Sequence, residues 1–312
     1  MIAITVKNIE AELVSASMQQ PVLLDIWAPW CAPCKALTPV LEKLEKDYAG
    51  RFKLAKLNSD EQPEIAGQLS QMFGVRSIPF CVLFSGGQPV DGFVGALPES
   101  QVRQFLDKHV PSESEMEAEA ELQEAEAELA EGNEDAALAR LQQALAMDPA
   151  NETARIDYVK LLLDLGRAAD ARRAFEPVAG KAPGDARLAA LAQAVEAFEQ
   201  AARARRPEEL AAAIAANKRD FAARHELAQV LLAAGRRTEA LDELLEILMR
   251  DKAWNEGQAR KLYVAILELM TKPAPKAAAE TKSTLEVTGK SAAAPSDPVV
   301  DQYRRRLSMV IF

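Results

Sequence analysis

The feature that most constrains this chain is a pair of cysteines, two residues apart, behind a continuous apolar segment. Residues 22–27 (VLLDIW) form that segment, and residues 30–35 (WCAPCK) carry Cys31 and Cys34. Such a segment is typical of a strand at the centre of a sheet, and the cysteines stand where a helix is expected to begin. Two thiols at this spacing can close and reopen a small disulfide ring. The pattern therefore indicates redox chemistry at the start of a helix.

Length and composition predict two or three domains. The 312 residues exceed one ordinary core, and 5% aromatic beside 49% apolar residues favours packed Ala/Leu helices. Residues 1–110 carry 10 basic and 12 acidic residues, whereas the remainder carries 27 and 35, so the acidity lies in the second part. Neither part has the basic face that nucleic-acid binding needs, so no nucleic-acid partner is expected.

The hydropathy pattern predicts a cytoplasmic location, which in turn limits the roles of the cysteines. The chain has no apolar run of about 18 residues, so no membrane span is expected. Its first residues alternate apolar and polar side chains and lack the apolar core and cleavage site of a signal peptide. In a reducing compartment three cysteines do not form a structural disulfide framework, which leaves catalysis, metal binding or burial as their roles.

The pattern of residues 1–110 predicts alternating strands and helices, with a hairpin turn at Gly86-Gly87 and a kink at Pro39. The order βαβαβαββα predicts an α/β unit, a central mixed sheet covered by helices on both faces. The expected strands are 2–7, 22–27, 52–57, 80–84 and 88–94, and the expected helices are 8–18, 34–48, 64–73 and 101–109.

Residues 111–271 are acidic, rich in Ala and Leu, and internally repetitive. Small and apolar positions of one segment return 34 residues later, and Gly235 continues the phase 69 residues after Gly166. A 34-residue helix-turn-helix period is the tetratricopeptide signature, so an all-α repeat domain is expected, with a degenerate unit at about 185–218. The matched positions are Gly132, Ala137, Leu141, Ala144 and Pro149 with Gly166, Ala171, Phe175, Val178 and Pro183.

The end of the chain differs from the repeats. Residues 272–297 are rich in Pro, Ala, Ser and Lys and are expected to form a flexible linker. Residues 298–312 are expected to form a short amphipathic helix that ends in apolar residues. An apolar end on a flexible linker predicts docking, either on the repeats as a cap or on a partner.

The two cysteines are expected to divide the redox work. The partial positive charge of a helix N-terminus favours thiolate over thiol, so Cys31 is expected to attack and Cys34 to resolve the mixed disulfide. Two alternatives are a buried pair of small hydrophobes and a zinc site. A zinc site needs four ligands, and only Cys81 and the distant His109 and His225 remain.

An aspartate inside the apolar segment supports the redox assignment. Burial of Asp25 would raise its pKa and let it exchange a proton with Cys34, with Lys56 as a partner on the next strand. The alternative is an edge position for this strand. Ile78-Pro79 is a candidate cis peptide that would expose backbone groups to an extended substrate. Cys81 is expected to be buried and inert.

Residues 1–110 resemble thioredoxin throughout. The resemblance is carried by Asp25 before residues 27–35 (WAPWCAPCK), by residues 73–79 (FGVRSIP) and by residues 94–97 (VGAL). Ala32 departs from the usual glycine, which leaves the redox potential open while the nucleophile is clear.

This resemblance implies a disulfide reductase with no cofactor beyond its redox-active disulfide, recycled by thioredoxin reductase. The residues that it implies for catalysis are Cys31, Cys34, Asp25 and Lys56. The residues that it implies for substrate binding are Trp30, Ile78, the cis-proline Pro79 and Gly95.

The whole chain is more similar to one offshoot, the chaperedoxin family known as CnoX or YbbN, which joins a thioredoxin domain to tetratricopeptide-like repeats. Residues 87–93 (GQPVDGF) and 302–307 (QYRRRL) fit that family. The resemblance implies a holdase that binds unfolding clients, guards their cysteines and transfers them to the chaperonin GroEL through its C-terminal helix. The partner-binding residues expected on that helix are Tyr303, Arg304, Leu307, Ile311 and Phe312.

Some chaperedoxins lack the first active-site cysteine and carry another after the third strand. Here the pair is complete and Ser59 occupies that second position, which predicts a redox-competent member. The protein is expected to be a monomer. Two alternatives remain. One is a reductase that its repeats deliver to a dedicated partner, without general holdase activity. The other is a scaffold with a vestigial site.

Overall fold

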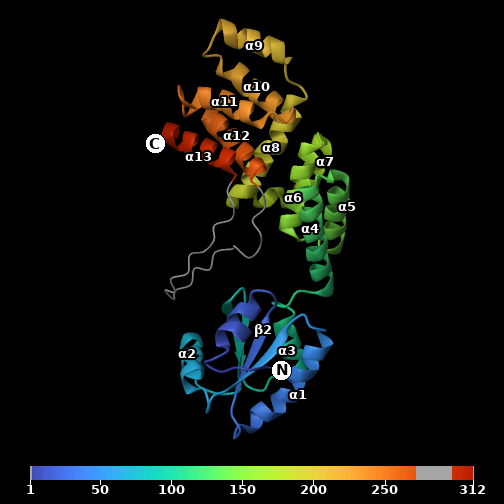
Figure 1. Ribbon diagram of the computed structural model, residues 1–312, viewed down its shortest axis with the longest axis vertical. Coiled ribbons are helices and arrows are strands. Elements are labelled where there is room, and N and C mark those ends of the chain that lie inside the picture. Colours follow the sequence, from blue (N-terminus) through green and yellow to red (C-terminus); the bar gives the residue numbers. More distant parts are fainter. Residues whose placement is uncertain (1, 272–296, 312) are drawn as a thin grey trace. The chain divides into compact units, whose positions relative to one another are not determined.

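A computed structural model describes residues 2–271 and 297–311 of the chain (Figure 1). These residues form two compact units, 2–116 and then 117–271 with 297–311. Except for Asp297, the predicted linker at 272–297 lies outside the described residues. Within the described ranges, no helix is both long and apolar enough to cross a bilayer.

The described part of the first unit is built on a mixed five-stranded sheet in the order β1-β3-β2-β4-β5. β2 lies at its centre, parallel to β3 and antiparallel to β4, while β1 and β5 form the edges. The fold therefore confirms the predicted α/β class with a central mixed sheet. The strands are β1 (Ile2–Ala3), β2 (Val22–Trp27), β3 (Lys53–Asn58), β4 (Phe80–Ser85) and β5 (Gln88–Val94).

Helices cover both faces of this sheet, because β2 is apolar on both. In Figure 1, α2 lies on one side of the sheet and α1 and α3 lie on the other. Leu23 packs with side chains of α1 and α3, and Leu24 packs with side chains of η1 and α2. Side chains alternate along a strand, so Asp25 faces the same side as Leu23, under α1. The helical segments are the π-helix η1 (Glu10–Ser15), α1 (Ala32–Asp47), α2 (Pro63–Phe73) and α3 (Glu99–Leu106).

The first strand is shorter than predicted. The expectation of a strand at 2–7 is wrong beyond Ala3, because the side chain of Asn8 hydrogen-bonds to the backbone of Ala3 and Thr5. Its Nδ2 donates to the carbonyl of Ala3 at 2.8 Å, and its Oδ1 accepts from the backbone N–H of Thr5 at 2.7 Å. A short polar side chain that bonds nearby backbone competes with a sheet ladder in this way.

Two helices begin two residues earlier than predicted. α1 begins at Ala32 because Cys31 is its N-cap, and it continues as one helix through Pro39. α3 begins at Glu99, directly after an extended Pro98. Because α1 begins at Ala32, both cysteines lie at its first turn.

The second unit consists of successive helices joined by short turns, which confirms the predicted helical repeats (Figure 1). Gly132, Gly166 and Gly235 lie between paired helices with φ of 83°, 70° and 75°, the left-handed conformation in which glycine ends a helix. The turn between α8 and α9 has no glycine, as expected for the degenerate repeat. The segments are α4 (Glu113–Glu131), α5 (Glu134–Met147), α6 (Glu152–Asp164), α7 (Ala168–Phe175), the 3₁₀ segment η2 (Glu176–Gly184), α8 (Ala186–Ala201), α9 (Pro207–Ala216), α10 (Phe221–Ala233), α11 (Arg237–Leu248) and α12 (Trp254–Met270).

The C-terminal helix α13 (Pro298–Ile311) packs on the repeats of its own chain. Tyr303 is only 7% exposed, and its carbonyl accepts a hydrogen bond from the Tyr263 hydroxyl of α12 at 3.0 Å. Its own hydroxyl donates to the carbonyl of Thr238 and to Asp242 of α11. Leu307 packs against the same core. The helix therefore caps the repeats, which was one of the two expected roles.

This packing divides the residues predicted to bind a partner. Tyr303 and Leu307 face the repeats, whereas Arg304 is exposed. Ile311 is half-buried, and its carbonyl accepts from Lys252. Phe312 lies outside the described residues. A partner contact through Tyr303 and Leu307 would require α13 to leave the repeats.

Truncating Tyr303 tests this packing. We expect Tyr303→Ala to lower the free energy of unfolding of the repeat unit by about 3 kcal/mol, because it empties a buried aromatic site. Tyr303→Phe removes only the hydroxyl and should cost about 1 kcal/mol. Met309→Ala, on the same helix but 75% exposed, is the control and should stay within about 0.5 kcal/mol of the wild type. Urea unfolding followed by helical circular dichroism measures these values; equal effects at Tyr303 and Met309 would contradict the packing.

Candidate active site

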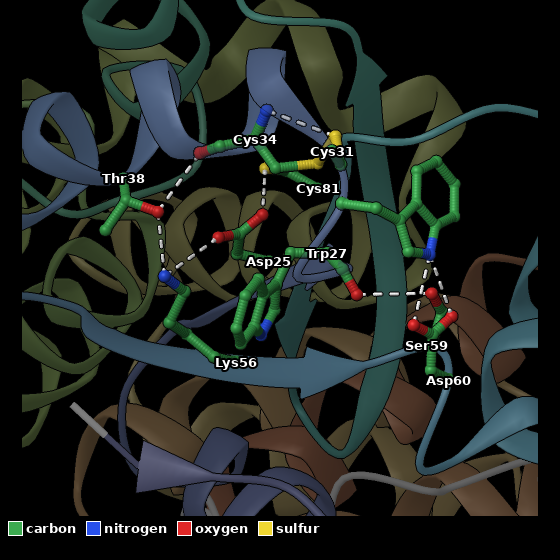
Figure 2. Close-up of a disulfide and its surroundings, with 10 residues drawn as sticks. Asp25, Trp27, Cys31, Cys34, Thr38, Lys56, Ser59, Asp60 and Cys81 are labelled. Atoms are coloured by element: carbon green, nitrogen blue, oxygen red, sulfur yellow. Dashed lines mark hydrogen bonds and ion pairs between the residues drawn. A yellow bond between two sulfur atoms is a disulfide. The ribbon is translucent and has the colours of Figure 1, made fainter.

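Cys31 and Cys34 form a disulfide across the first turn of α1 (Figure 2). Cys31 has the extended backbone of an N-cap, and its Sγ accepts the backbone N–H of Cys34 at 3.2 Å. Pro33, inside this turn, suits a helix start because its nitrogen has no hydrogen to leave unpaired. Cys31 is 4% exposed and Cys34 is fully buried, so an incoming group meets Cys31 first.

Asp25 lies at the centre of the sheet with 0% exposure. In the sheet register it stands between Lys56 of β3 and Cys81 of β4, which excludes an edge position for its strand. Lys56 Nζ lies 3.7 Å from Asp25 Oδ2, and Cys81 Sγ donates to Asp25 Oδ1 at 3.9 Å (Figure 2). Burial raises the pKa of Asp25 to about 6, although the Lys56 charge opposes this rise.

Lys56 and Cys81, which both contact Asp25, each have a defined environment. Lys56 Nζ donates to Thr38 Oγ1 at 2.8 Å and lies 5.0 Å from the centre of the Trp27 ring. Burial and the negative charge of Asp25 both raise the pKa of the Cys81 thiol. Cys81 is buried, as predicted, and its thiol stays protonated. Its contact with Asp25 has no signal in the sequence, because it depends on the register of two antiparallel strands.

The surface beside the disulfide is an open groove of about 680 Å³. Trp30 is 70% exposed at its edge, and its Nε1 donates to the carboxylate of Asp60. Ser59 Oγ donates to the carbonyl of Trp27 (Figure 2). The role of Asp60 was not predicted, because it contacts Trp30 only through the fold. The groove is lined by Ile26, Trp30, Ser59, Pro63, Ala66, Gly67, Ser70, Val75, Arg76, Ser77 and Ile78.

The remaining predicted substrate residues lie together next to this groove. The Ile78–Pro79 peptide is cis. The carbonyl of Pro79 accepts the backbone N–H of Gly95 at 2.8 Å, and Gly95 has φ of 89°, which favours glycine. The structure thus brings Ile78, Pro79 and Gly95 to one place on the first unit.

A polar pocket that the sequence did not predict lies among α8, α10 and the start of α12. It has a volume of about 150 Å³ and adjoins an open hollow of about 390 Å³ beside Trp254. His225 Nε2 is buried there without a hydrogen-bond partner among the described residues, and burial lowers the pKa of His225. Asn255 lines the pocket with φ of 46°, a strained value for a non-glycine residue. The pocket is lined by Gln193, Glu196, Ala197, Gln200, His225, Gln229, Asn255, Gln258 and Leu262.

Side-chain amides both donate and accept hydrogen bonds, and the Glu196 carboxylate accepts them, so this pocket suits polar groups such as those of a peptide main chain. Its residues come from three helices, which is why no single stretch of sequence revealed it. For metals, the described residues hold no group of three or more His, Cys, Asp or Glu side chains arranged to bind an ion.

Comparisons with known proteins agree with both parts of the chain. The family model described as Thioredoxin matches residues 1–108, and two described as Tetratricopeptide repeat match residues 128–195 and 200–286. The chain is 47% identical over 90 residues to Thioredoxin 1 of Nostoc sp., covering 29% of this chain and 80% of that protein. It is 45% identical over 106 residues to Thioredoxin of Chlorobaculum thiosulfatiphilum, covering 34% of this chain and 93% of that protein.

The raised pKa of Asp25 predicts a pH-dependent stability. The pKa is about 6 in the folded protein and about 3.9 in an unfolded chain, so the folded protein binds more protons between these values. Stability should therefore fall as the pH rises through this window. Asparagine cannot ionise, so we expect Asp25→Asn to match the wild type near pH ~4 and to exceed it by about 3 kcal/mol near pH ~8. Urea unfolding of the oxidised protein at both pH values measures the difference.

Glu64→Gln is the matched control, since it removes an exposed carboxylate from the same unit and should track the wild type. A stability difference between Asp25→Asn and the wild type that stays constant with pH would contradict the raised pKa.

Proposed function

The chain belongs to the thioredoxin family, and on this premise we propose that it is a redox-active chaperedoxin of the cytoplasm. In this proposal it holds unfolding proteins, reduces or protects their cysteines and transfers them to the chaperonin GroEL. The chain is a thioredoxin-like disulfide oxidoreductase fused to tetratricopeptide repeats. The observation that carries the proposal is the intact Cys31–Cys34 pair above a buried Asp25, in one chain with a repeat array that reduction alone does not need.

Reduction begins with Cys31. In the reduced protein the positive end of α1 and the Cys34 backbone N–H favour its thiolate. The thiolate attacks one sulfur of a client disulfide; a bond forms from Cys31 Sγ to that sulfur, the client S–S bond breaks, and one client thiolate leaves. The mixed disulfide then holds the client beside the groove.

Cys34 completes the reaction. Its thiol loses a proton to Asp25, and the thiolate attacks Cys31 Sγ. The Cys31–Cys34 bond forms, the bond to the client breaks, and the second client thiolate leaves. Two electrons have passed from the protein to the client, and we propose that thioredoxin reductase returns them. Lys56 orients the Asp25 carboxylate during this exchange.

The groove supports binding of an extended client segment next to the disulfide. Trp30 and Ile78 offer apolar surface at its edges, and the backbone of Ile78 lies there beside the cis peptide bond to Pro79. Such backbone groups can pair with a client main chain whatever its sequence, which suits a protein with many clients.

The packing of α13 on the repeats changes which of its residues are proposed to contact the chaperonin. Because Tyr303 faces the repeats, the contact is assigned to the outward face of α13, where Arg304 and Met309 are exposed. Met309 is 75% exposed, so the helix carries an apolar side chain that the repeats do not cover.

One observation favours the alternative of a reductase directed to a dedicated partner. The pocket among α8, α10 and α12 is small and lined mostly by side-chain amides. Holding many unfolded proteins calls for exposed apolar surface, whereas such a pocket selects a particular polar group. Trapping of clients separates the two functions.

The Cys34→Ser variant provides that trap. Without the resolving thiol, we expect mixed disulfides on Cys31 to accumulate and insulin reduction to fall by roughly 1,000-fold or more. Mass spectrometry of the trapped species identifies the proteins. Many clients together with GroEL would support the chaperedoxin, and one dominant protein would support targeted delivery. The Cys31→Ser/Cys34→Ser double variant is the control and should trap nothing; turnover by that variant would contradict the dithiol mechanism.

Met309→Glu separates holding from transfer. We expect this variant to lose GroEL binding in co-sedimentation, because a charge replaces exposed apolar surface on α13. It should keep insulin reduction, its thermal midpoint and its suppression of the aggregation of a chemically unfolded client. Ser308→Glu adds the same charge at the neighbouring exposed position and is the matched control. If the wild type fails to suppress aggregation at stoichiometric excess, the holdase function is excluded.

A further inference from the structure

Thr38 lies one turn beyond Cys34 on α1 and connects the disulfide turn to Lys56. Its Oγ1 accepts from Lys56 Nζ at 2.8 Å and donates to the carbonyl of Cys34 at 3.1 Å (Figure 2). An ammonium group can only donate and a carbonyl can only accept, so the direction of both bonds is settled by the groups themselves. The hydroxyl therefore uses its one hydrogen on Cys34 and its oxygen on Lys56.

This bridge leaves the pairing of Asp25 incomplete. Lys56 Nζ lies 3.7 Å from Asp25 Oδ2, beyond the 2.7–2.9 Å typical of a charge-assisted hydrogen bond. Asp25 Oδ2 is buried and has no hydrogen-bond partner among the described residues. The Trp27 ring, 5.0 Å from Lys56 Nζ, gives the ammonium a second contact away from Asp25.

We propose that Thr38 is a positioning residue that holds Lys56 short of a hydrogen bond with Asp25, so that Asp25 Oδ2 stays free to take the proton of Cys34. The inference rests on the proposed dithiol chemistry and adds to it the residue that sets the base. In the resolving step the Cys34 S–H bond breaks, the proton moves to Asp25 Oδ2, and the sulfur attacks Cys31 Sγ. The client thiolate leaves with the electron pair of the broken S–S bond.

The physical reason is that a close Lys56–Asp25 ion pair would weaken Asp25 as a base. A direct hydrogen bond from Lys56 would stabilise the Asp25 carboxylate and lower its pKa, which would make it a weaker base. Among the described residues, the titratable groups that contact this carboxylate are Lys56 from β3 and Cys81 from β4. Cys34 of α1 becomes titratable once the disulfide is reduced. Of these, Lys56 carries the charge that Thr38 controls.

The test isolates the resolving step with a small aromatic disulfide, dithiobis(nitrobenzoic acid), and the reduced full chain. Attack by Cys31 releases one nitrobenzoate thiolate, and attack by Cys34 releases a second in a phase independent of reagent concentration. We measure the rate of this second phase as a function of pH. Thr38→Val keeps the shape of the side chain but removes the hydroxyl. We expect it to shift the acid limb of this pH–rate profile, where the rate rises with pH, to lower pH by about 1 unit and to lower the plateau rate. Thr38→Ser keeps the hydroxyl and should keep the wild-type profile.

A double-mutant cycle with Lys56→Met decides whether Thr38 acts through Lys56. With the ammonium removed, Thr38→Val should cause no further shift of the acid limb. The proposal is overturned if Thr38→Val alone leaves the limb unchanged, if it moves the limb to higher pH, or if its shift persists without Lys56. Loss of the first phase instead would indicate a failure of the Cys31 chemistry, and thus of the proposed function. Thr38→Ala replaces Thr38→Val if the latter does not fold.

Discussion

The first unit depends on one costly feature, a carboxylate placed at the centre of an apolar sheet. Burying a charge without partners is expensive, so the groups around Asp25 have to compensate for part of that cost. Lys56 supplies an opposite charge from β3, and Cys81 supplies a weak donor from β4. The compensation is partial, and burial keeps the pKa of Asp25 near 6. A group with such a pKa can bind and release a proton at neutral pH, which is what exchange at Cys34 requires.

In the second unit, small side chains allow the helices to pack closely. Ala137, Ala171 and Ala240 occupy the same position of the repeat and are fully buried, so paired helices can approach closely. An array of repeats leaves apolar surface at its end, and α13 covers this surface with Val300 and Tyr303. The polar pocket lies among α8, α10 and α12, so its side chains are held by well-packed helices.

Much of this could be predicted because it is local in the sequence. The apolar run before Cys31 indicated a central strand, and a carboxylate within that run indicated a buried acid. The 34-residue period predicted the turns at Gly132 and Gly166. These features depend on spacing along one segment, which a sequence displays directly.

The rest depends on how segments meet. The contact of Cys81 with Asp25 follows from strand register, and the bond from Thr38 to Lys56 joins α1 to β3. Asn8 shortens the first strand through its own side chain, a competition that strand propensity does not reveal. The resemblance implied that Tyr303 binds a partner, whereas its packing on α11 and α12 depends on contacts between segments that are far apart in the sequence.

The central claim is that Asp25 is a buried base held just short of full ion pairing. The most direct measurement is a carbon-13 NMR titration of its side-chain carboxyl in the oxidised full-length protein, assigned with the Asp25→Asn variant. The account predicts a midpoint at about pH 6. A midpoint near 4, the value of an ordinary exposed aspartate, would contradict it.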